Sequence, residues 1–294
     1  MPAPLVEIAP AKINLTLRVV GRRADGYHEL ESLVVFADFG DRLSFVSGST
    51  LALTVRGPTA KAAGAGTDNL VLKAARALAA NAPGMALGAF RLDKRLPVAA
   101  GIGGGSADAG AALRLLARAN GLALDDPRLF AAARAAGADV PVCLDPRARI
   151  MHGVGEILSA ALTMPSLPAV LVNPGVALPT KDVFAGWKPA GATTAPLDPG
   201  EIGTVSTRAE LVRYLAAQSN DLEAPAIALA PQVADALDAL RALKGCQLAR
   251  MSGSGATCFG LFASVAASRE AAKILRSRHS QWWAKAATLG AAQS

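Results

Sequence analysis

A glycine-rich run ahead of an alanine-rich segment is the part of this chain whose residues best suit a chemical role. It reads Pro97-Val98-Ala99-Ala100-Gly101-Ile102-Gly103-Gly104-Gly105-Ser106, with four glycines in five positions from Gly101. Glycines let backbone N–H groups approach an anion without a Cβ in the way, and a following helix adds about half a positive charge at its N-terminus. A tight turn is the alternative, but so many glycines are costly unless something approaches the backbone closely. The run predicts a phosphate-binding loop.

Commoner phosphate-binding motifs do not fit this run. A Walker A loop needs Gly-Lys-Ser/Thr, and the chain contains no Gly-Lys pair. A dinucleotide fingerprint needs glycine or alanine where Ser106 stands, and the strands ahead of the run are predicted to be antiparallel. Asp38-Phe39-Gly40 spells the magnesium tripeptide of protein kinases, but no His-Arg-Asp segment precedes it. We interpret that tripeptide as a strand-to-turn transition.

A second glycine-containing run, Ser252-Gly253-Ser254-Gly255, lies between two predicted strands in residues 247–262. It would bring another set of backbone N–H donors beside the first run. A simple glycine hairpin is the alternative, and spacing alone does not exclude it.

The elements that must position these runs follow from hydrophobic periodicity. Residues 1–90 alternate apolar and polar side chains between glycine-containing turns, which predicts a mainly antiparallel sheet. Helices are predicted at 70–78 behind the capping residues Thr67-Asp68-Asn69, at 107–118, 127–136, 208–218 and 233–243, and strands at 90–93 and 169–172. Residues 138–143 are predicted to be a turn or short strand, 187–203 an exposed connection, and the segment from Ser277 a partly ordered appendage. We place the domain boundary near residue 160, giving domains 1–160 and 161–294.

Composition limits the classes of function. Apolar residues make up 52% of the chain and charged residues 18%, which excludes a disordered chain and fits a soluble α/β or α+β protein. Cys143, Cys246 and Cys258 lie too far apart for a CxxC pair and favour buried thiols in a reducing cytoplasm. A net charge of +7 suits an acidic partner, but 4% aromatic residues leave few stacking platforms for nucleic acid. Neither nucleic-acid nor membrane binding is expected.

Three motifs in order make the chain resemble the GHMP kinase superfamily. They are Pro10-Ala11-Lys12-Ile13-Asn14-Leu15, the glycine run through Ala109, and Met251-Ser252-Gly253-Ser254-Gly255-Ala256-Thr257. Asp25-Gly26-Tyr27-His28 and Gly137-Ala138-Asp139-Val140-Pro141 resemble a subfamily whose acceptor is a cytidine diphosphate-linked methylerythritol. The resemblance implies an α+β fold, with an N-terminal ATP-binding domain like domain 2 of ribosomal protein S5 and a ferredoxin-like C-terminal domain. It also implies transfer of the γ-phosphoryl group of ATP to the acceptor's 2-hydroxyl.

The resemblance assigns roles to individual residues. Lys12 and Asp139 match the catalytic pair, in which a carboxylate accepts the hydroxyl proton beside a stabilising ammonium. ATP is expected to bind Pro97, Val98, Ala99, Ala100, Gly101, Ile102, Gly103, Gly104, Gly105, Ser106 and Ala107, and the acceptor Asn14, Tyr27, His28, Phe184, Ser252, Gly253, Ser254 and Gly255. The alternatives without a catalytic or binding role are a turn aspartate for Asp139, a solvent-facing strand lysine for Lys12 and core packing for the aromatic rings. No protein metal site is expected, Mg²⁺ is expected to bind mainly through ATP, and the protein is expected to be a monomer or weak homodimer.

Two residues depart from the subfamily pattern, and two rival functions stay open. Ala107 replaces a second serine of the loop, and Cys143 replaces a more typical aromatic residue. Another GHMP kinase, acting on mevalonate or homoserine, would share the ATP loop but lack Tyr27-His28. A non-catalytic GHMP-fold nucleotide-binding protein would lack Lys12 or Asp139, and both are present.

Overall fold

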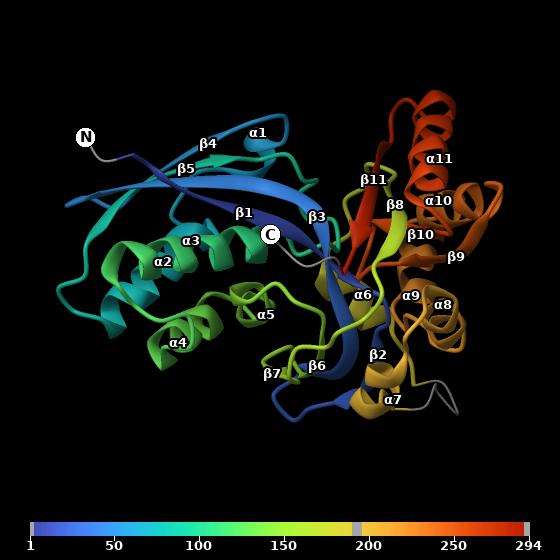
Figure 1. Ribbon diagram of the computed structural model, residues 1–294, viewed down its shortest axis with the longest axis horizontal. Helices are drawn as coiled ribbons and strands as arrows, with labels where there is room; N and C mark the ends of the chain where they lie inside the picture. Colours follow the sequence, from blue (N-terminus) through green and yellow to red (C-terminus); the bar gives the residue numbers. More distant parts are fainter. Residues whose placement is uncertain (1–2, 190–195, 291–294) are drawn as a thin grey trace. The chain divides into compact units, whose positions relative to one another are not determined.

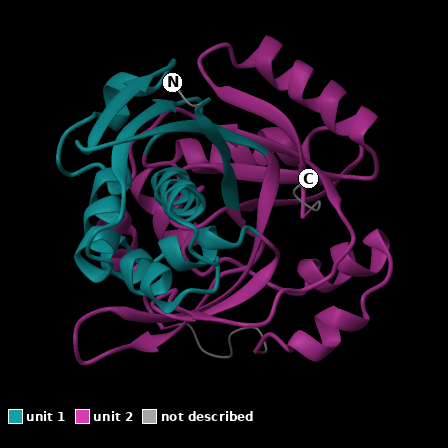
Figure 2. Cartoon of the chain, turned by 60° about the vertical axis from the view of Figure 1, so that its left-hand side comes forward, with its two compact units in different colours: residues 1–12, 39–98, 103–146 teal, residues 13–38, 99–102, 147–294 magenta. Residues whose placement is uncertain are grey.

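A computed structural model describes residues 3–189 and 196–290 of the chain. The chain divides into two compact units that alternate along the sequence (Figures 1 and 2). Unit 1 contains residues 1–12, 39–98 and 103–146, and unit 2 contains residues 13–38, 99–102 and 147–294. Each unit combines strands and helices, so the α+β prediction is confirmed. The domain boundary near residue 160 stays a prediction.

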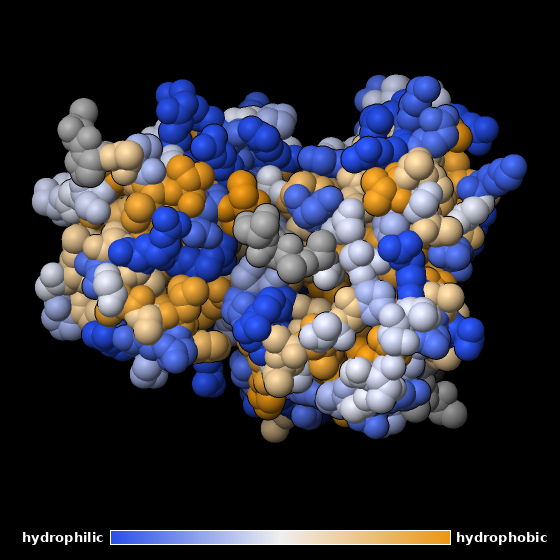
Figure 3. All heavy atoms as spheres, in the orientation of Figure 1, coloured by the Kyte–Doolittle hydropathy of each residue, from blue (hydrophilic) through white to orange (hydrophobic). Residues whose placement is uncertain are grey.

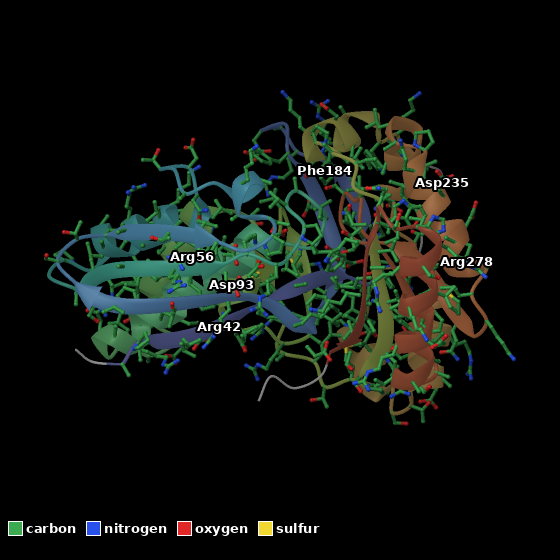
Figure 4. The ribbon with its side chains drawn as sticks, turned by 90° about the horizontal axis from the view of Figure 1, so that it is seen from above. Arg42, Arg56, Asp93, Phe184, Asp235 and Arg278 are labelled. Carbon is green, nitrogen blue, oxygen red and sulfur yellow. The ribbon has the colours of Figure 1, made fainter. Side chains whose placement is uncertain are left out.

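The sheet of unit 1 is built from β1, the second half of β3, β4 and β5. Their bounds are Leu5–Asn14, His28–Gly48, Ala52–Arg56 and Leu87–Asp93, with β3 entering unit 1 at residue 39. β3 and β5 are antiparallel and β4 and β5 are parallel, while β1 pairs with β3. Asp93 is the register partner of both Arg42 and Arg56, and Figure 4 shows the three on neighbouring strands. Phe45, Phe90 and Leu92 supply the buried side of these strands.

Among the residues of unit 1 that the structure describes there are five helices, of which α2, α3 and α4 pack against one another. The helices are α1 (Ala60–Ala63), α2 (Leu70–Asn81), α3 (Gly104–Asn120), α4 (Pro127–Ala136) and α5 (Val140–Leu144). Local signals set the ends of the long ones: the side chain of Asn69 caps α2, that of Asp126 caps α4, and Gly121 ends α3 in the left-handed conformation. The sequence-based predictions of these three helices are confirmed.

The prediction of a turn or short strand at residues 138–143 is wrong, because Val140–Leu144 form the helix α5. Pro141 lies in the first turn, where a missing N–H costs nothing. Burial of the whole helix against α3 then overrides the strand preference of Val140 and Val142. Gly110 of α3 permits the close approach, since a Cβ there would lie 2.5 Å from the carbonyl oxygen of Cys143.

The expected strand-to-turn transition at Asp38-Phe39-Gly40 is also wrong, because β3 continues through it as one long strand. Gly40 is required by close packing rather than by a turn. A Cβ at this position would overlap the backbone of Ala9 and Pro10 in β1. The glycine therefore allows two strands of unit 1 to come together.

Unit 2 contains a group of antiparallel strands, together with further strands that pair with the first half of β3. These strands are β2 (Arg18–Arg22), β6 (Arg149–Gly153), β7 (Ile157–Leu158), β8 (Leu167–Asn173), β9 (Cys246–Met251), β10 (Cys258–Phe262) and β11 (Trp283–Leu289), with the first half of β3. β8 pairs with β10 and β11, and β10 pairs with β9. β2 and β6 both pair with β3. The predicted strand, glycine turn and strand across residues 247–262 are confirmed as β9 and β10.

In the described part of unit 2 there are six helices, of which α10 and α11 lie along β8, β9 and β10 (Figure 1). The six are α6 (Thr180–Gly186), α7 (Pro199–Thr204), α8 (Arg208–Ala216), α9 (Glu223–Leu229), α10 (Gln232–Arg241) and α11 (Val265–Arg278). Leu237, Leu240 and Leu275 of α10 and α11 belong to one buried cluster with Val170 and Val172 of β8. The predicted helices near 208–218 and 233–243 are confirmed.

Two further sequence-based predictions in unit 2 are wrong. The segment from Ser277 is not an appendage, since α11 runs to Arg278 and β11 pairs with β8 along seven residues. Ala284, Ala287 and Leu289 of β11 are buried, but four of its seven positions are alanine or lysine, which have weak strand preference. Part of the expected connection at 187–203 forms α7, because Asp198 caps it and Ile202 is buried; residues 190–195 lie outside the described part.

The surface is mixed in character. Figure 3 shows hydrophobic residues interspersed with hydrophilic ones on the face in view. Within residues 3–189 and 196–290, no helix has the length and apolar content needed to cross a membrane. The thiols of Cys143, Cys246 and Cys258 are free, as the sequence predicts.

Candidate active site

The N-terminus of α3 is a feature of unit 1 whose geometry suits an anion. Gly103 is its N-cap residue, with a left-handed φ of 59°, and no side chain caps the helix. The N–H of Ala107 donates to Gly103 O at 2.8 Å. The N–H groups of Gly104, Gly105 and Ser106 have no acceptor inside the helix, because the first turn has none to offer. These three donors, together with the helix dipole, suit a phosphate.

The glycines of this turn are needed because lysine side chains lie against the backbone. A Cβ on Gly103 would lie 3.0 Å from Cβ and 3.2 Å from Cε of Lys12. A Cβ on Gly104 would lie 3.1 Å from Nζ of Lys94. Ala107 is 1% exposed, and its N–H is already used by the helix. Its methyl group therefore belongs to the packing of α3, where the subfamily pattern has a second serine.

Lys12 and Asp139 form an ion pair within unit 1. Lys12 Nζ donates to Asp139 Oδ2 at 2.9 Å, with the lysine side chain 4% exposed and the carboxylate 39% exposed. Asp139 occupies the N-cap position of α5 but makes no capping hydrogen bond. Its carboxylate is thus held by the ammonium and stays open on one side. A carboxylate held in this way can accept a proton from a hydroxyl group.

Arg114 of α3 ties together the elements that carry this ion pair. The guanidinium is 7% exposed and donates to Cys143 O at 2.7 Å in α5 and to Ile8 O at 2.8 Å in β1. Its Nε donates to Glu7 at 3.0 Å. The sequence pattern did not indicate this role for Arg114, because a helical arginine ordinarily signals a solvent-exposed face.

Cys143, the departure from the subfamily pattern, is 1% exposed. Burial raises the pKa of the Cys143 thiol to about 12. The side chain is therefore a neutral thiol that packs between helices, and its carbonyl serves as an acceptor for Arg114.

In unit 2, residues 99–102 of the glycine run lie against the second run. A Cβ on Gly101, whose φ is +72°, would lie 2.6 Å from Gly255 O. Thr257 N–H donates to Ala100 O at 3.1 Å. Ala99 has a φ of 53°, a left-handed conformation that costs an L-residue about 1 kcal/mol. Backbone strain of this kind often accompanies functional sites.

Ser252 joins the two runs and the end of β1. Its hydroxyl accepts from Asn14 N–H at 3.0 Å and donates to Gly101 O at 2.9 Å, and the residue is fully buried. Asn14 donates its amide to Ser32 Oγ at 2.7 Å. Within the described residues, Asn14 Oδ1 is buried and has no hydrogen-bond partner. An unpaired buried acceptor costs about 1–3 kcal/mol, which a ligand hydroxyl group would recover.

The second run is fixed by side chains that sequence analysis did not single out. The amide of Asn220 donates to Met251 O and Gly253 O, both at 2.8 Å. Glu223 accepts from Met251 N–H at 2.9 Å. Ser254 is 8% exposed and shares a hydrogen bond of 2.9 Å with Thr180. The run is thus a rigid loop rather than a free hairpin tip.

Three aromatic side chains meet at one corner of unit 2. The rings of His28 and Phe184 are stacked at a centroid distance of 5.0 Å, and Trp187 meets His28 edge-on at 5.6 Å. Figure 4 labels Phe184 on α6. Tyr27, which directly precedes His28 in the sequence, is 65% exposed. Sequence analysis assigned Trp187 to an exposed connection and so missed it. We call His28, Phe184 and Trp187 the aromatic cluster.

The surroundings of His28 favour its neutral imidazole. Burial lowers its pKa below 6.5, and the nearby charge of Arg22 lowers it further. A neutral imidazole has one donor and one acceptor nitrogen. It can therefore hydrogen-bond a base edge while its ring stacks.

Comparison with known proteins shows what the chain is similar to. The pattern described as "GHMP kinases N terminal domain" matches residues 69–145, and "GHMP kinases C terminal" matches residues 203–285. A 4-diphosphocytidyl-2-C-methyl-D-erythritol kinase of Methylobacterium radiotolerans is 59% identical over 95% of this chain and 97% of its own. One of Rhodopseudomonas palustris is 58% identical over 96% of both chains.

Solved structures agree with these relatives. A crystal structure of 4-(cytidine 5'-diphospho)-2C-methyl-D-erythritol kinase superposes with a TM-score of 0.77 at 36% identity, covering 98% of this chain and 100% of that one. A homoserine kinase from Cytophaga hutchinsonii, at 18% identity, has a TM-score of 0.73 over 98% of this chain and 95% of that one, and shows the fold alone. On identity, coverage and the two matched domains, the chain belongs to the 4-diphosphocytidyl-2-C-methyl-D-erythritol kinase family of the GHMP kinases.

Proposed function

We propose that this protein phosphorylates the 2-hydroxyl of 4-diphosphocytidyl-2-C-methyl-D-erythritol with ATP, giving the 2-phosphate and ADP. The reaction is a step of the non-mevalonate route to isoprenoid precursors. The observation that carries the proposal is the 59% identity to a kinase of that name, over 95% of the chain. The ion pair of Lys12 and Asp139 supports it, because phosphoryl transfer to an alcohol needs a group that accepts the hydroxyl proton.

Asp139 acts as the base in this mechanism. Its carboxylate takes the proton of the 2-hydroxyl as that oxygen attacks the γ-phosphorus. The new O–P bond forms while the bond from the γ-phosphorus to the β–γ bridging oxygen breaks, and ADP leaves with that electron pair. Lys12 holds the Asp139 carboxylate at 2.9 Å and offsets negative charge during the transfer. The rest of the catalysis is positioning of the two substrates.

The free N–H groups of Gly104, Gly105 and Ser106 hold phosphates of ATP at the start of α3. Ser106 is half-buried in that first turn and carries a hydroxyl oxygen, the type of ligand that Mg²⁺ prefers. It fits as one protein ligand, while most of the ligands would come from ATP. Mg²⁺, when bound, would neutralise charge on the phosphate oxygens.

The aromatic cluster and Tyr27 recognise the cytosine ring. Phe184 and Trp187 are half-buried, and stacking on aromatic faces is the usual way to hold a base. The neutral imidazole of His28 offers a hydrogen bond to the edge of the base. Asn14 Oδ1 is the acceptor for a hydroxyl group of the methylerythritol part.

The cellular setting is proposed on simpler grounds. The protein acts on a small molecule, as a monomer or weak homodimer, in the cytoplasm. Three free thiols are consistent with a reducing compartment.

The test is an ATP-consumption assay with three acceptors in parallel. In the presence of Mg²⁺, the purified protein should release ADP with 4-diphosphocytidyl-2-C-methyl-D-erythritol and not with mevalonate or homoserine. Phosphorus NMR of the product should show a new phosphomonoester on the methylerythritol part. Turnover of mevalonate or homoserine, without turnover of the cytidine substrate, would replace this proposal by another GHMP kinase activity.

A further inference from the structure

A cluster of three buried charged side chains lies under the start of α3 in unit 1. Lys94 directly follows β5, and its ammonium donates to Asp108 Oδ2 at 2.6 Å and to Asp41 Oδ2. The three residues are 2%, 3% and 0% exposed for Lys94, Asp108 and Asp41. Charged groups are expensive to bury, and here one ammonium group lies between two carboxyl groups. We call Lys94, Asp41 and Asp108 the buried triad.

Within unit 1, the buried triad connects the residues just before Pro97 with the helix that follows the glycine run. Asp41 Oδ1 accepts from the N–H groups of Arg95 at 2.5 Å and Leu96 at 2.8 Å, directly before Pro97. Asp108 lies near the start of α3, behind the last glycine of the run. Lys94 bridges the two carboxylates, so one side chain sets the distance between the entry to the run and the helix after it.

Lys94 also packs against the turn that would bind phosphate. A Cβ on Gly104 would lie 3.1 Å from Lys94 Nζ and 3.6 Å from Leu96 Cδ1. A side chain at position 104 would therefore be crowded by the ammonium group and by the segment that Asp41 holds, so both lie close to this turn.

The triad is poorly explained as a device for stability alone. Buried ion pairs are often no more stabilising than well-packed apolar residues of similar volume. Asp108 Oδ1 is buried and has no hydrogen-bond partner within the described residues, an arrangement that costs stability. Burial raises the pKa of Asp108 well above its usual range, and the charge of Asp41 adds to this. For Lys94, burial lowers the pKa, but the two carboxylates outweigh it and raise the pKa overall.

We propose that Lys94, Asp41 and Asp108 are positioning residues that fix the first turn of α3 for the phosphates of ATP. They act through the backbone of Gly104 and of Leu96 and touch neither substrate. The inference rests on the proposed function for the identity of the nucleotide. It goes beyond that function because it assigns part of the affinity for ATP to residues outside the phosphate-binding run.

The test measures nucleotide affinity and steady-state kinetics in Lys94→Met, Asp108→Asn and the double variant Lys94→Met/Asp108→Leu. Calorimetry with a non-hydrolysable ATP analogue and Mg²⁺ should show Kd raised about tenfold or more in Lys94→Met, the scale of a lost hydrogen bond to a charged group. Asp108→Asn keeps an acceptor for Lys94 and should weaken binding by about threefold, below that scale. The double variant removes one of the two buried carboxyl groups that Lys94→Met leaves without an ammonium, so it should fold more readily than Lys94→Met and should still bind the analogue weakly.

The matched controls are Lys73→Met on the exposed face of α2 and Asp125→Asn in an exposed loop. Both should bind the analogue like the unaltered protein. The KM for ATP should rise in the triad variants while the KM for the cytidine substrate stays within about twofold, the scatter expected between separate sites. Lower melting temperatures with unchanged Kd and KM for ATP would overturn the proposal and leave a purely structural triad. The analogue titration does not depend on the acceptor, so failure of the proposed function would be visible separately.

Discussion

The ion pair of unit 1 and the aromatic cluster of unit 2 are built in opposite ways. Lys12 is 4% exposed on its side chain and fixed at 2.9 Å from Asp139, between elements that Arg114 ties together. The aromatic cluster is half-buried, and its sequence neighbour Tyr27 is 65% exposed. Groups that take part in chemistry gain from being fixed in advance, whereas rings that stack on a ligand must be uncovered. The contrast predicts that changes in the two regions will affect different kinetic constants.

The largest effect should follow from Asp139→Asn. The amide keeps the size of the side chain but cannot accept the hydroxyl proton, so kcat should fall by about 10²–10⁴-fold. The KM values should change little, because neither the start of α3 nor the aromatic cluster is altered. Steady-state kinetics with both substrates, and calorimetry with an ATP analogue, measure the two parts of this prediction.

Asp125→Asn is the matched control for that variant, since Asp125 is exposed and also lies in unit 1. It should retain the kcat of the unaltered protein. If Asp139→Asn keeps kcat within about threefold, a factor far below that of general base catalysis, Asp139 is not the base.

Arg114→Met tests whether the ion pair is held in advance by its surroundings. The methionine removes a buried guanidinium and leaves the carbonyls of Cys143 and Ile8 without their donor. The free energy of unfolding should fall by about 3 kcal/mol, the scale for breaking a buried charged group's contacts. Urea denaturation followed by circular dichroism measures it. Kinetic constants at a temperature where the variant is folded show whether kcat falls as well.

Arg118→Met on the same helix provides the comparison, because Arg118 is 50% exposed and also bonds Glu7. An exposed pair of this kind contributes roughly 0–1 kcal/mol. Equal losses of stability in the two variants would contradict the view that Arg114 holds the site together.

Phe184→Ala should affect the other kinetic constant. Stacking of a base on an aromatic ring is worth about 1–3 kcal/mol, so the KM for the cytidine substrate should rise by roughly 5-fold to 150-fold. The kcat at saturation and the KM for ATP should change far less, since α6 carries neither Lys12 nor Asp139. Phe130→Ala on α4, where the ring is 39% exposed, is the matched control. A fall in kcat with unchanged KM would place Phe184 in the support of the fold instead.

Local signals in the sequence predicted three helices of unit 1 but not β11 of unit 2. The N-caps Asn69 and Asp126 and the terminal Gly121 are short-range features, and they set the helices where the pattern predicts them. β11 depends on pairing with β8, which lies more than a hundred residues earlier, and no local pattern encodes that contact. Its alanines gave no strong strand signal.

For the candidate site, the sequence predicted the residues with recognisable motifs and missed those that support them. Lys12 and Asp139 stand in patterned segments, and the structure brings them together. Lys94, Arg114 and Asn220 are polar residues whose importance comes from burial, and residue type alone assigns such side chains to the surface. Only the folded chain shows that they bind backbone carbonyls or carboxylates.

The smallest predicted effect concerns the charge of His28, which belongs to the half-buried aromatic cluster. Burial and the charge of Arg22 lower its pKa below 6.5, so Arg22→Gln should raise it toward that value in an imidazole NMR titration. Below pH 6.5 the unfolded chain binds this proton more readily than the folded chain does. The contribution of His28 to the free energy of unfolding is therefore full above pH 6.5 and is lost as the pH falls through the folded pKa. Arg23→Gln, whose arginine pairs with Asp25, is the matched control and should leave the His28 titration in place. An identical His28 titration in Arg22→Gln and the unaltered protein would mean that burial in the aromatic cluster alone keeps the imidazole neutral.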